Sequence, residues 1–489
     1  MRGVANYIGG LWTRPAASDW TPVVNPATSE MLGRVPLDGS DDVADAVASA
    51  AKAFPAWRDV PPGDRIQFLF RFKQLLEEHL DEIARIVSQE NGKTYAESVG
   101  EIRRGIENVE VACGIPTLMQ GYNLEDIARG IDETMIRQPL GVVGVITPFN
   151  FPVMIPLWFL PYAIACGNAL VIKPSEKVPL SIRRVVEILE RTGLPKGVVN
   201  VANGGRSAAD ALLKHPEVRA VSFVGSSPVA RHVYATAAKH GKRVQCQGGA
   251  KNHVVVLPDA DLETTTKIVG DSAFGCAGQR CLAVSAVVTV GEAHKPFLES
   301  IVEAAGSLTV GNGLDKGVEM GPVITSQSRS RIETAIARGT ADGARAALDG
   351  RGIRVSGYPR GNFVGPTVLE GVDTNSHLSA TEVFGPVLGI THVNTVDAAI
   401  DVIARNPYGN ASSIFTASGS SARRFRRDVP TGNVGVNIGV AAPMAYFPFS
   451  GWKDSFFGTL HGQGRDAVEF YTDKKVVIER WPQEWSRRF

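Results

Sequence analysis

The sequence has few cysteines, almost no net charge and no long apolar run. Its five cysteines are too few for a disulfide framework in a chain of 489 residues. Cys276 and Cys281 lie close together, but no nearby pair of His or Cys could complete a zinc site, so we expect no metal. The 51 basic and 50 acidic residues leave a formal net charge of +1, which favours neither nucleic acid nor an anionic membrane as a partner.

The sequence also lacks a segment that would cross a membrane. Residues 151–166 form the most apolar stretch, but Pro152, Pro156 and Pro161 interrupt it. It is also shorter than the roughly 18 apolar residues that a membrane span needs. The N-terminus has no apolar core of the kind found in secretory signal peptides. We therefore expect a cytoplasmic protein with no membrane partner.

The chain is long enough for two or three domains, and its periodicity favours an α/β fold. Residues 42–91 repeat apolar side chains every three or four positions, which predicts helix. From Gly141 onward, strands are expected at 142–146, 169–174, 198–201 and 220–224, separated by helical stretches that include 180–191 and 207–214. A second alternating block has expected strands near 254–257, 284–290 and 434–438. This alternation predicts βαβ units and parallel sheets.

Ligands of such sheets lie beyond the carboxyl ends of the strands, where the first block carries Asn150, Lys173 and Gly225. The chain has no G-x-G-x-x-G after a strand, so the usual dinucleotide motif is missing. A possible nucleophile stands in the second block. Cys281 follows a run of small residues and the guanidinium of Arg280, which would favour a thiolate. Taken alone this is weak, because a free cysteine is more often a small buried apolar residue.

Four ordered motifs strengthen the case, and together they resemble the aldehyde dehydrogenase superfamily. They are Thr-Pro-Phe-Asn-Phe-Pro (147–152), Lys-Pro-Ser-Glu (173–176), Phe-Gly-Cys-Ala-Gly-Gln-Arg-Cys (274–281) and Glu-Val-Phe-Gly-Pro-Val (382–387). The resemblance implies an α/β aldehyde dehydrogenase fold with three parts. A Rossmann-like NAD domain would cover 1–120 and 140–249, an α/β catalytic domain 250–461, and a small β oligomerisation element 121–139 and 462–489. The last part implies a dimer or a dimer of dimers, of which the homotetramer is the expected assembly, although the sequence does not fix the subunit count.

The resemblance also assigns site residues. Cys281 would be the nucleophile, and the Asn150 side chain and the Cys281 backbone N–H would stabilise the alkoxide that forms when the thiolate attacks an aldehyde. The residues expected to bind NAD are Ile146, Thr147, Pro148, Phe149, Lys173, Ser175, Glu176, Gly225, Ser226, Glu382 and Phe384. A carboxylate at Glu176 accepts from the ribose hydroxyls and would repel a 2′-phosphate, so NAD is expected rather than NADP.

One departure indicates how the reaction ends. Hydrolytic members carry a glutamate that activates water, and the corresponding position here is Gln247, whose amide cannot take a proton. The pattern, with Gly-Ala-Lys-Asn-His at 249–253, resembles the CoA-acylating methylmalonate-semialdehyde (malonate-semialdehyde) dehydrogenases. That branch usually has other residues at Gln247, Gly248 and Cys276.

The branch implies a substrate and a co-substrate. A semialdehyde would be oxidised and decarboxylated, and the acyl group would pass to CoA. Its carboxylate suits a guanidinium, so Arg104, Arg280 and, beside them, Phe151 are expected to bind the substrate. Two alternatives stay open: a hydrolytic NAD-dependent semialdehyde dehydrogenase that releases a free acid, and a non-catalytic homologue that serves as a binding or structural protein.

Overall fold

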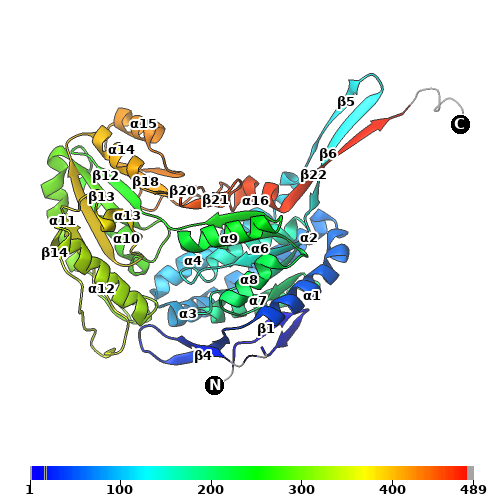
Figure 1. Cartoon of the computed structure of the whole chain (residues 1–489), viewed down its shortest axis with the longest axis horizontal. Helices are drawn as coiled ribbons and strands as arrows, with labels where there is room; N and C mark the ends of the chain where they lie inside the picture. Colours follow the sequence, from blue (N-terminus) through cyan, green and yellow to red (C-terminus); the bar gives the residue numbers. More distant parts are fainter. Residues whose placement is uncertain (1–2, 16, 18, 482–489) are drawn as a thin grey trace, which may run out of the picture.

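The chain forms two α/β bodies and a projecting β-stranded arm (Figure 1). This computed structural model describes residues 3–15, 17 and 19–481. An eight-stranded sheet runs through the larger body, a seven-stranded sheet through the smaller one, and a three-stranded sheet forms the arm. The α/β class expected from the alternating periodicity is confirmed.

The eight-stranded sheet has the order β2-β1-β9-β8-β7-β10-β11-β21. Its strands are β1 (Asn6–Ile8), β2 (Leu11–Thr13), β7 (Val142–Ile146), β8 (Ala169–Lys173), β9 (Val199–Val201), β10 (Val218–Val224), β11 (Arg243–Gln247) and β21 (Phe456–Gly458). Neighbours from β9 to β11 pair in parallel. Their carboxyl ends therefore lie along one edge of the sheet. Strand β21 belongs to the range expected for the catalytic domain, yet it pairs with β11.

Helices bury both faces of this sheet. Val143 and Val145 of β7 pack into one apolar cluster with α4 (Tyr95–Ala112), α6 (Met154–Ala165) and α7 (Pro179–Glu190). Val142 and Ile146 pack on the opposite face with α1 (Ser40–Arg58), α8 (Arg206–Lys214) and α9 (Ser227–Lys239). Burial on both sides explains why β7 is a continuous apolar run rather than an alternating one.

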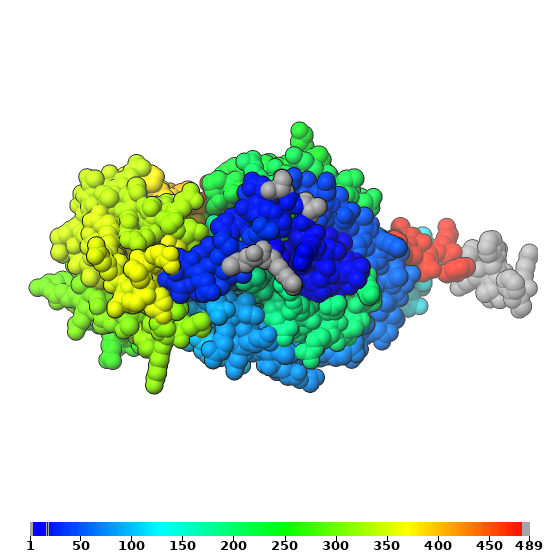
Figure 2. All heavy atoms as spheres, turned by 90° about the horizontal axis from the view of Figure 1, so that it is seen from below, coloured from blue at the N-terminus to red at the C-terminus, as the bar shows by residue number. Residues whose placement is uncertain are grey.

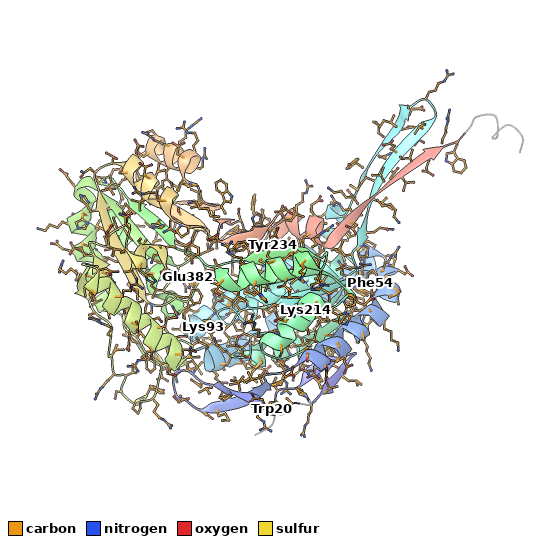
Figure 3. All side chains as sticks on the ribbon, viewed as in Figure 1. Trp20, Phe54, Lys93, Lys214, Tyr234 and Glu382 are labelled. Atoms are coloured by element: carbon orange, nitrogen blue, oxygen red, sulfur yellow. The ribbon has the colours of Figure 1, made fainter. Side chains whose placement is uncertain are left out.

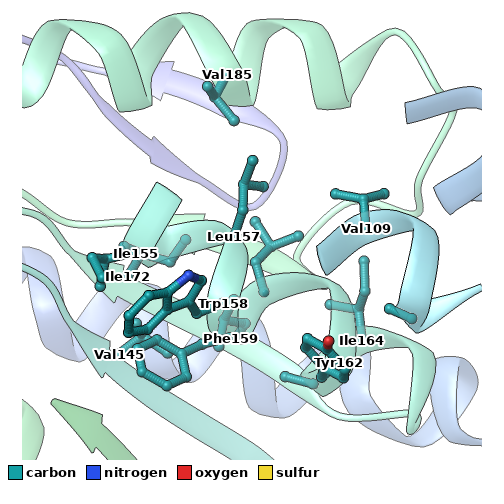
Figure 4. Close-up of a cluster of buried hydrophobic side chains, with 14 of the residues drawn as sticks. Val109, Val145, Ile155, Leu157, Trp158, Phe159, Tyr162, Ile164, Ile172 and Val185 are labelled. Atoms are coloured by element: carbon teal, nitrogen blue, oxygen red, sulfur yellow. The ribbon is translucent and has the colours of Figure 1, made fainter. Parts of the chain in front are cut away.

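Helix α6 lies at the centre of the first cluster. Its side chains are buried all round, and Leu157, Trp158, Phe159 and Tyr162 gather beside the sheet (Figure 4). Full burial of each such side chain contributes about 2–3 kcal/mol relative to an exposed one. This packing fixes the loop that joins β7 to α6, which carries Asn150.

The seven-stranded sheet has the order β14-β15-β16-β13-β12-β18-β19. Its strands are β12 (Asn252–Val256), β13 (Val284–Val290), β14 (Arg345–Leu348), β15 (Thr367–Glu370), β16 (Val387–Val393), β18 (Ala411–Phe415) and β19 (Asn433–Val436). All neighbours except β14 and β15 pair in parallel. One face packs on α10 (Leu262–Phe274), α11 (His294–Gly306) and α12 (Ser326–Ala341), and the other on α14 (Val396–Arg405) and α15 (Gly419–Asp428).

The arm consists of β5 (Tyr122–Ala128), β6 (Ile131–Pro139) and β22 (Thr472–Arg480), in the order β22-β6-β5. It extends away from the larger body in Figure 1. Short α5 (Ile115–Leu118) precedes it, and α16 (Gly464–Tyr471) leads into β22. Part of the expected oligomerisation element, residues 482–489, lies outside the described residues.

Two further strand pairs are β3 (Trp20–Val24) with β4 (Met31–Pro36) and β17 (Tyr408–Gly409) with β20 (Trp452–Lys453). The described fold also includes the short α13 (His377–Ala380) and two 3-10 helices, Gly275–Gly278 and Gly291–Ala293. Seen from below, the N-terminal residues cover the underside of the larger body beside the smaller one (Figure 2). The helical periodicity of 42–91 is confirmed, but it divides into α1, α2 (Pro62–Glu78) and α3 (Leu80–Asn91). Helix α2 begins at Pro62, and proline suits this first helical position because the N–H that it lacks would have no partner within the helix.

Candidate active site

A cleft of about 1160 Å³ is lined by residues of both α/β bodies. Its lining includes Asn150 and Cys281 and every residue that the sequence predicts to bind the cofactor. The larger sheet contributes residues that follow β7, β8 and β10, and the smaller body contributes Cys281, Glu382 and Phe384. Segments far apart in the chain therefore meet as the motifs predict.

Lys173 and Glu176 form an ion pair in one part of the cleft. Lys173 Nζ lies 3.4 Å from Glu176 Oε2. Burial lowers the pKa of Lys173, although Glu176 opposes that effect. Burial disfavours the charged Glu176, yet Lys173 and a backbone N–H outweigh it and hold the pKa of Glu176 below its ordinary value. The carboxylate is thus kept ionised and can accept hydrogen bonds from hydroxyl groups.

The Gly225–Ser226 turn opens α9 toward the cleft. Ser226 is the N-cap residue, and Ser226, Pro228 and Val229 line the cleft at this helix N-terminus. The Gly225 N–H donates to the carbonyl of Gln247 (3.0 Å), and a Cβ at Gly225 would lie 2.5 Å from the Phe223 ring. A side chain does not fit here, and the free N–H groups of a helix N-terminus favour an anion.

Cys281 and Asn150 meet across the two bodies. Asn150 Nδ2 lies 3.5 Å from Cys281 Sγ and donates to the carbonyl of Gln279 at 3.0 Å. The Cys281 carbonyl in turn accepts from Asn252 Nδ2 and Asn410 Nδ2, both at 2.8 Å. Burial raises the pKa of the Cys281 thiol to about 11, and the Asn150 hydrogen bond opposes the rise.

The loop before Cys281 has an unusual backbone. Cys276 (φ 51°) and Ala277 (φ 52°) adopt left-handed conformations, and so does Gly278 (φ 70°). A Cβ at Gly278 would lie 2.1 Å from the carbonyl oxygen of Gly385, so this loop packs directly against the segment that follows Glu382. Such conformations cost non-glycine residues about 1–3 kcal/mol each and persist only where the surroundings impose them.

Glu382 projects near the junction of the two bodies (Figure 3). One carboxylate oxygen accepts from the Ala250 N–H at 2.8 Å. Burial raises the pKa of Glu382 to about 7, while this N–H and the charges of Arg331 and Lys251 oppose the rise. Its charge therefore changes near neutral pH.

Gln247 ends β11 beside the Gly225 turn. Its Nε2 donates to the carbonyl of Phe449 at 3.1 Å, and its backbone carbonyl accepts from Gly225. The side chain is buried, with 4% of the residue exposed. The amide oxygen can accept a hydrogen bond from a water molecule but cannot take its proton as a base.

The expected positive field of Arg280 at the sulfur is not observed. Its guanidinium pairs with Glu97 (3.1 Å) and donates to Cys276 Sγ (3.2 Å), so its charge is directed elsewhere. Arg104 pairs with Glu107 at 2.7 Å and donates to the Pro443 carbonyl at 2.7 Å. Arg104, Arg280 and Phe151 are not among the residues lining the cleft, and their substrate roles stay predictions.

Some residues that shape the site carry no sequence signal of their own. Lys93 and Asn91 bind the backbone of the 149–150 turn, and Asn252 and Asn410 bind the Cys281 carbonyl. The sequence alone does not show that these polar residues are buried, so it could not identify them as parts of the site. No group of three or more His, Cys, Asp or Glu in the described residues could hold a metal ion. None of the helices described is long and apolar enough for a membrane span.

Comparison with known proteins agrees with this geometry. Residues 12–477 match the model of the aldehyde dehydrogenase family. Malonate-semialdehyde dehydrogenase 2 of Geobacillus kaustophilus is 49% identical over 484 residues, which cover 98% of this chain and 99% of the relative. A crystal structure of methylmalonate-semialdehyde dehydrogenase from Oceanimonas doudoroffii is 44% identical, with a TM-score of 0.98 and full coverage of both chains (100% each).

A second solved structure was determined with a ligand. The putative methylmalonate-semialdehyde dehydrogenase of Sinorhizobium meliloti, complexed with NAD, is 41% identical, with a TM-score of 0.97 and 99% of each chain covered. One conclusion follows from the family match, the full-length identity and the position of Cys281, Asn150 and Glu382 in one cleft. The chain belongs to the aldehyde dehydrogenase family.

Proposed function

We propose that the chain oxidises malonate or methylmalonate semialdehyde with NAD, decarboxylates the acyl group and transfers it to CoA. The single observation that carries this proposal is Gln247, a buried amide where hydrolytic relatives have a glutamate. Full-length relatives named for these semialdehydes support the substrate class. CoA is implied by the branch resemblance.

NAD fits the cleft. Gly225 leaves room for a pyrophosphate beside the N-terminus of α9, and the ionised Glu176 suits a ribose with two free hydroxyls. Ile146, Thr147, Pro148, Phe149, Lys173, Ser175, Glu176, Gly225, Ser226, Glu382 and Phe384 would hold it. When bound, NAD supplies the nicotinamide ring that accepts a hydride.

The chain's own residues would begin the reaction. The Cys281 thiolate adds to the aldehyde carbon, and the carbonyl electron pair moves to oxygen. Asn150 Nδ2 and the Cys281 N–H then donate to the alkoxide; loss of one such donor costs about 3 kcal/mol in the barrier. Collapse of the alkoxide expels the hydride and leaves a thioester on Cys281.

The thioester carries a carboxylate β to its carbonyl. Loss of CO₂ leaves an enolate, which the same two donors stabilise, and the enolate takes up a proton. The CoA thiolate then attacks the carbonyl, the C–S bond to Cys281 breaks, and acetyl-CoA or propionyl-CoA leaves with Cys281 again a thiolate. Arg104 and Arg280 would bind the carboxylate before it is lost, once Arg280 releases part of its contact with Glu97.

The test is NADH formation from methylmalonate, malonate and succinate semialdehydes, each with and without CoA. We expect sustained turnover only with CoA and only with the first two substrates. Full turnover without CoA would establish the hydrolytic alternative, which Gln247 disfavours. Labelled substrate that gave methylmalonyl-CoA and no CO₂ would remove the decarboxylation step.

We propose that the arm builds a homotetramer as a dimer of dimers. Apolar side chains on its strands are exposed, namely Tyr122, Leu124, Ile127, Val476 and Ile478. An exposed sheet edge with apolar side chains is a site for pairing with another chain. Val476→Lys with Ile478→Lys should reduce the mass measured by light scattering, and an unchanged mass would contradict this role.

The domain ranges 1–120 with 140–249, 250–461, and 121–139 with 462–489 belong to the same proposal, as does a cytoplasmic location. Cell fractionation would test the location. Limited proteolysis would test whether cleavage concentrates between the proposed parts.

A further inference from the structure

The corner between α3 and α4 contacts both halves of the proposed catalytic centre. Helix α3 ends at Gly92, which is left-handed (φ 95°), and Thr94 caps α4 in a capping box with Glu97. Lys93 lies between them, and Figure 3 shows it in the larger body near the junction with the smaller one. Only 2% of Lys93 is exposed, so its ammonium is removed from water.

Lys93 has three partners in this buried position. Its Nζ donates to Glu101 Oε2 at 2.5 Å and to the Asn150 carbonyl at 2.7 Å, and it lies 4.1 Å from the centre of the Phe151 ring. The second oxygen of Glu101 accepts from the N–H groups of Val153 (2.8 Å) and Met154 (3.1 Å). The pair thus holds the loop between β7 and α6 at Asn150 and again where α6 begins.

Two neighbours extend these contacts. Asn91 Nδ2 donates to the Phe149 carbonyl at 2.8 Å. Glu97 accepts from the Cys276 N–H at 2.5 Å and pairs with Arg280, so the first turn of α4 also holds the loop that ends at Cys281. Contacts from one corner therefore reach both Asn150 and the nucleophile loop.

A buried ion pair is a weak source of stability, because the cost of removing two charges from water offsets their attraction. The two buried charges therefore point to a contribution other than stability. The Asn150 side chain lies 3.5 Å from Cys281 Sγ, so a shift of the Asn150 backbone changes the geometry at the sulfur. Lys93 is also a positive charge that favours the Cys281 thiolate, which Arg280 does not provide here.

We infer that Lys93, paired with Glu101, is a positioning residue that fixes Asn150 against Cys281 and supplies the positive field at the nucleophile. This inference rests on the proposed roles of Cys281 and Asn150. Lys93 acts through Asn150 and through its charge, without touching the aldehyde.

The first test compares a variant that removes the Lys93 charge together with its partner and a variant that removes only the partner. Lys93→Met with Glu101→Gln removes both charges, so no unpaired charge stays buried. Glu101→Gln alone keeps Lys93 and removes its counter-ion. We measure the rate of Cys281 alkylation by iodoacetamide from pH 7 to 11 in the full-length protein, with the product located by mass spectrometry.

The two variants should shift the profile in opposite directions. Alkylation of the double variant should slow about twofold below the thiol pKa, because Lys93 is the weakest of the groups that favour the thiolate. Glu101→Gln alone should accelerate alkylation, because the uncompensated ammonium favours the thiolate. A general loss of packing around Cys281 would instead expose the thiol and accelerate alkylation in both variants.

The second measurement separates positioning from loss of fold. In the double variant, kcat should fall about 100-fold, since a displacement of about 1 Å at a reacting group has that effect, while KM for NAD changes little. Lys242→Met is the matched control: Lys242 is buried and donates to the carbonyls of His215 and Val218, away from the cleft.

The inference fails if the double variant leaves the alkylation profile unchanged, or if its kcat falls no further than that of Lys242→Met. A failure of the proposed function is distinguishable, because alkylation of Cys281 requires neither the semialdehyde nor CoA. If Cys281→Ala retained NADH formation, the function would be wrong even where the alkylation profiles shifted as expected.

Discussion

The two sheets contribute to the cleft from opposite ends of their strands. In the larger body, Lys173 ends β8, and Asn150, Gly225 and Gly248 follow β7, β10 and β11. In the smaller body, Cys281 precedes β13, and Glu382 and Phe384 precede β16. The rule that ligands lie beyond the carboxyl ends of parallel strands therefore accounts for one wall of the cleft and not for the other.

The backbone differs between the walls as well. The larger sheet presents ordinary turns and a helix N-terminus, which suit binding of a cofactor. In the smaller body, Cys276, Ala277 and Phe384 have positive φ values of 51°, 52° and 52°. The strain lies where the nucleophile must be placed. We call the larger body's side of the cleft, which carries most of the predicted cofactor contacts and also Asn150, the binding wall. The smaller body's side, which carries Cys281, is the reacting wall.

Substitution of the nucleophile should have the largest effect and separates the two walls most sharply. Cys281→Ala should lower NADH formation by roughly 10⁴-fold or more, because the described residues lining the cleft include no second cysteine. NAD affinity should stay within a factor of about two, since the larger sheet is unchanged. Steady-state absorbance and a fluorescence titration measure both quantities, and a parallel loss of NAD binding would contradict the division.

Gly278 tests whether the reacting wall depends on close backbone packing. Gly278 and Gly352 share a φ of 70°, but a Cβ at Gly278 meets the Gly385 carbonyl at 2.1 Å, whereas nothing lies within 4 Å at Gly352. Gly352→Ala should lower the free energy of unfolding by about 1 kcal/mol. Gly278→Ala should lower it by about 3 kcal/mol, since overpacking is added to the strain.

Chemical denaturation of the two variants side by side gives these values. The matched φ makes Gly352→Ala the control for backbone strain alone. Equal losses in the two variants would mean that the contact between the Cys281 loop and the segment after Glu382 is unimportant.

Much of this arrangement could be predicted from the sequence. The β-branched runs at 142–146 and 284–290 predicted strands with their observed bounds. The ordered motifs correctly predicted that Asn150, Cys281 and Glu382 lie in one cleft. The prediction that the Arg280 charge acts on the Cys281 sulfur was wrong. Two residues that are adjacent in the sequence need not point their side chains in the same direction. Its partner Glu97 is distant in sequence.

The contribution of Lys93 could not be predicted for a similar reason. In the sequence it is an ordinary lysine between two helices, and lysines are mostly exposed. Only the packing of α4 against α6 reveals that it is buried beside Glu101 and Asn150. A single sequence does not show which polar groups are buried by contacts with segments distant in the chain.

Glu176 tests the binding wall alone. Glu176→Gln removes the charge that repels a 2′-phosphate, so kcat/KM for NADP relative to NAD should rise about tenfold, which corresponds to about 1.4 kcal/mol. Glu263→Gln, an exposed residue of α10 outside the cleft, is the control. An unchanged ratio would show that Glu176 serves only as the partner of Lys173.

The smallest effect is expected at Glu382, which belongs to the reacting wall but is predicted to bind the cofactor. Its pKa is raised from 4.5 to about 7 by burial, so the carboxyl is mostly neutral at pH 6 and mostly charged at pH 8. The charged form accepts stronger hydrogen bonds from ribose hydroxyls, by about 1 kcal/mol. NAD should therefore bind about fivefold more tightly as the pH rises from about 6 to 8, and Glu382→Gln should bind with no such dependence. Fluorescence titration of both proteins with NAD across this pH range measures the dependence. If Glu382→Gln retained the wild-type slope, another group would control the pH dependence of NAD binding.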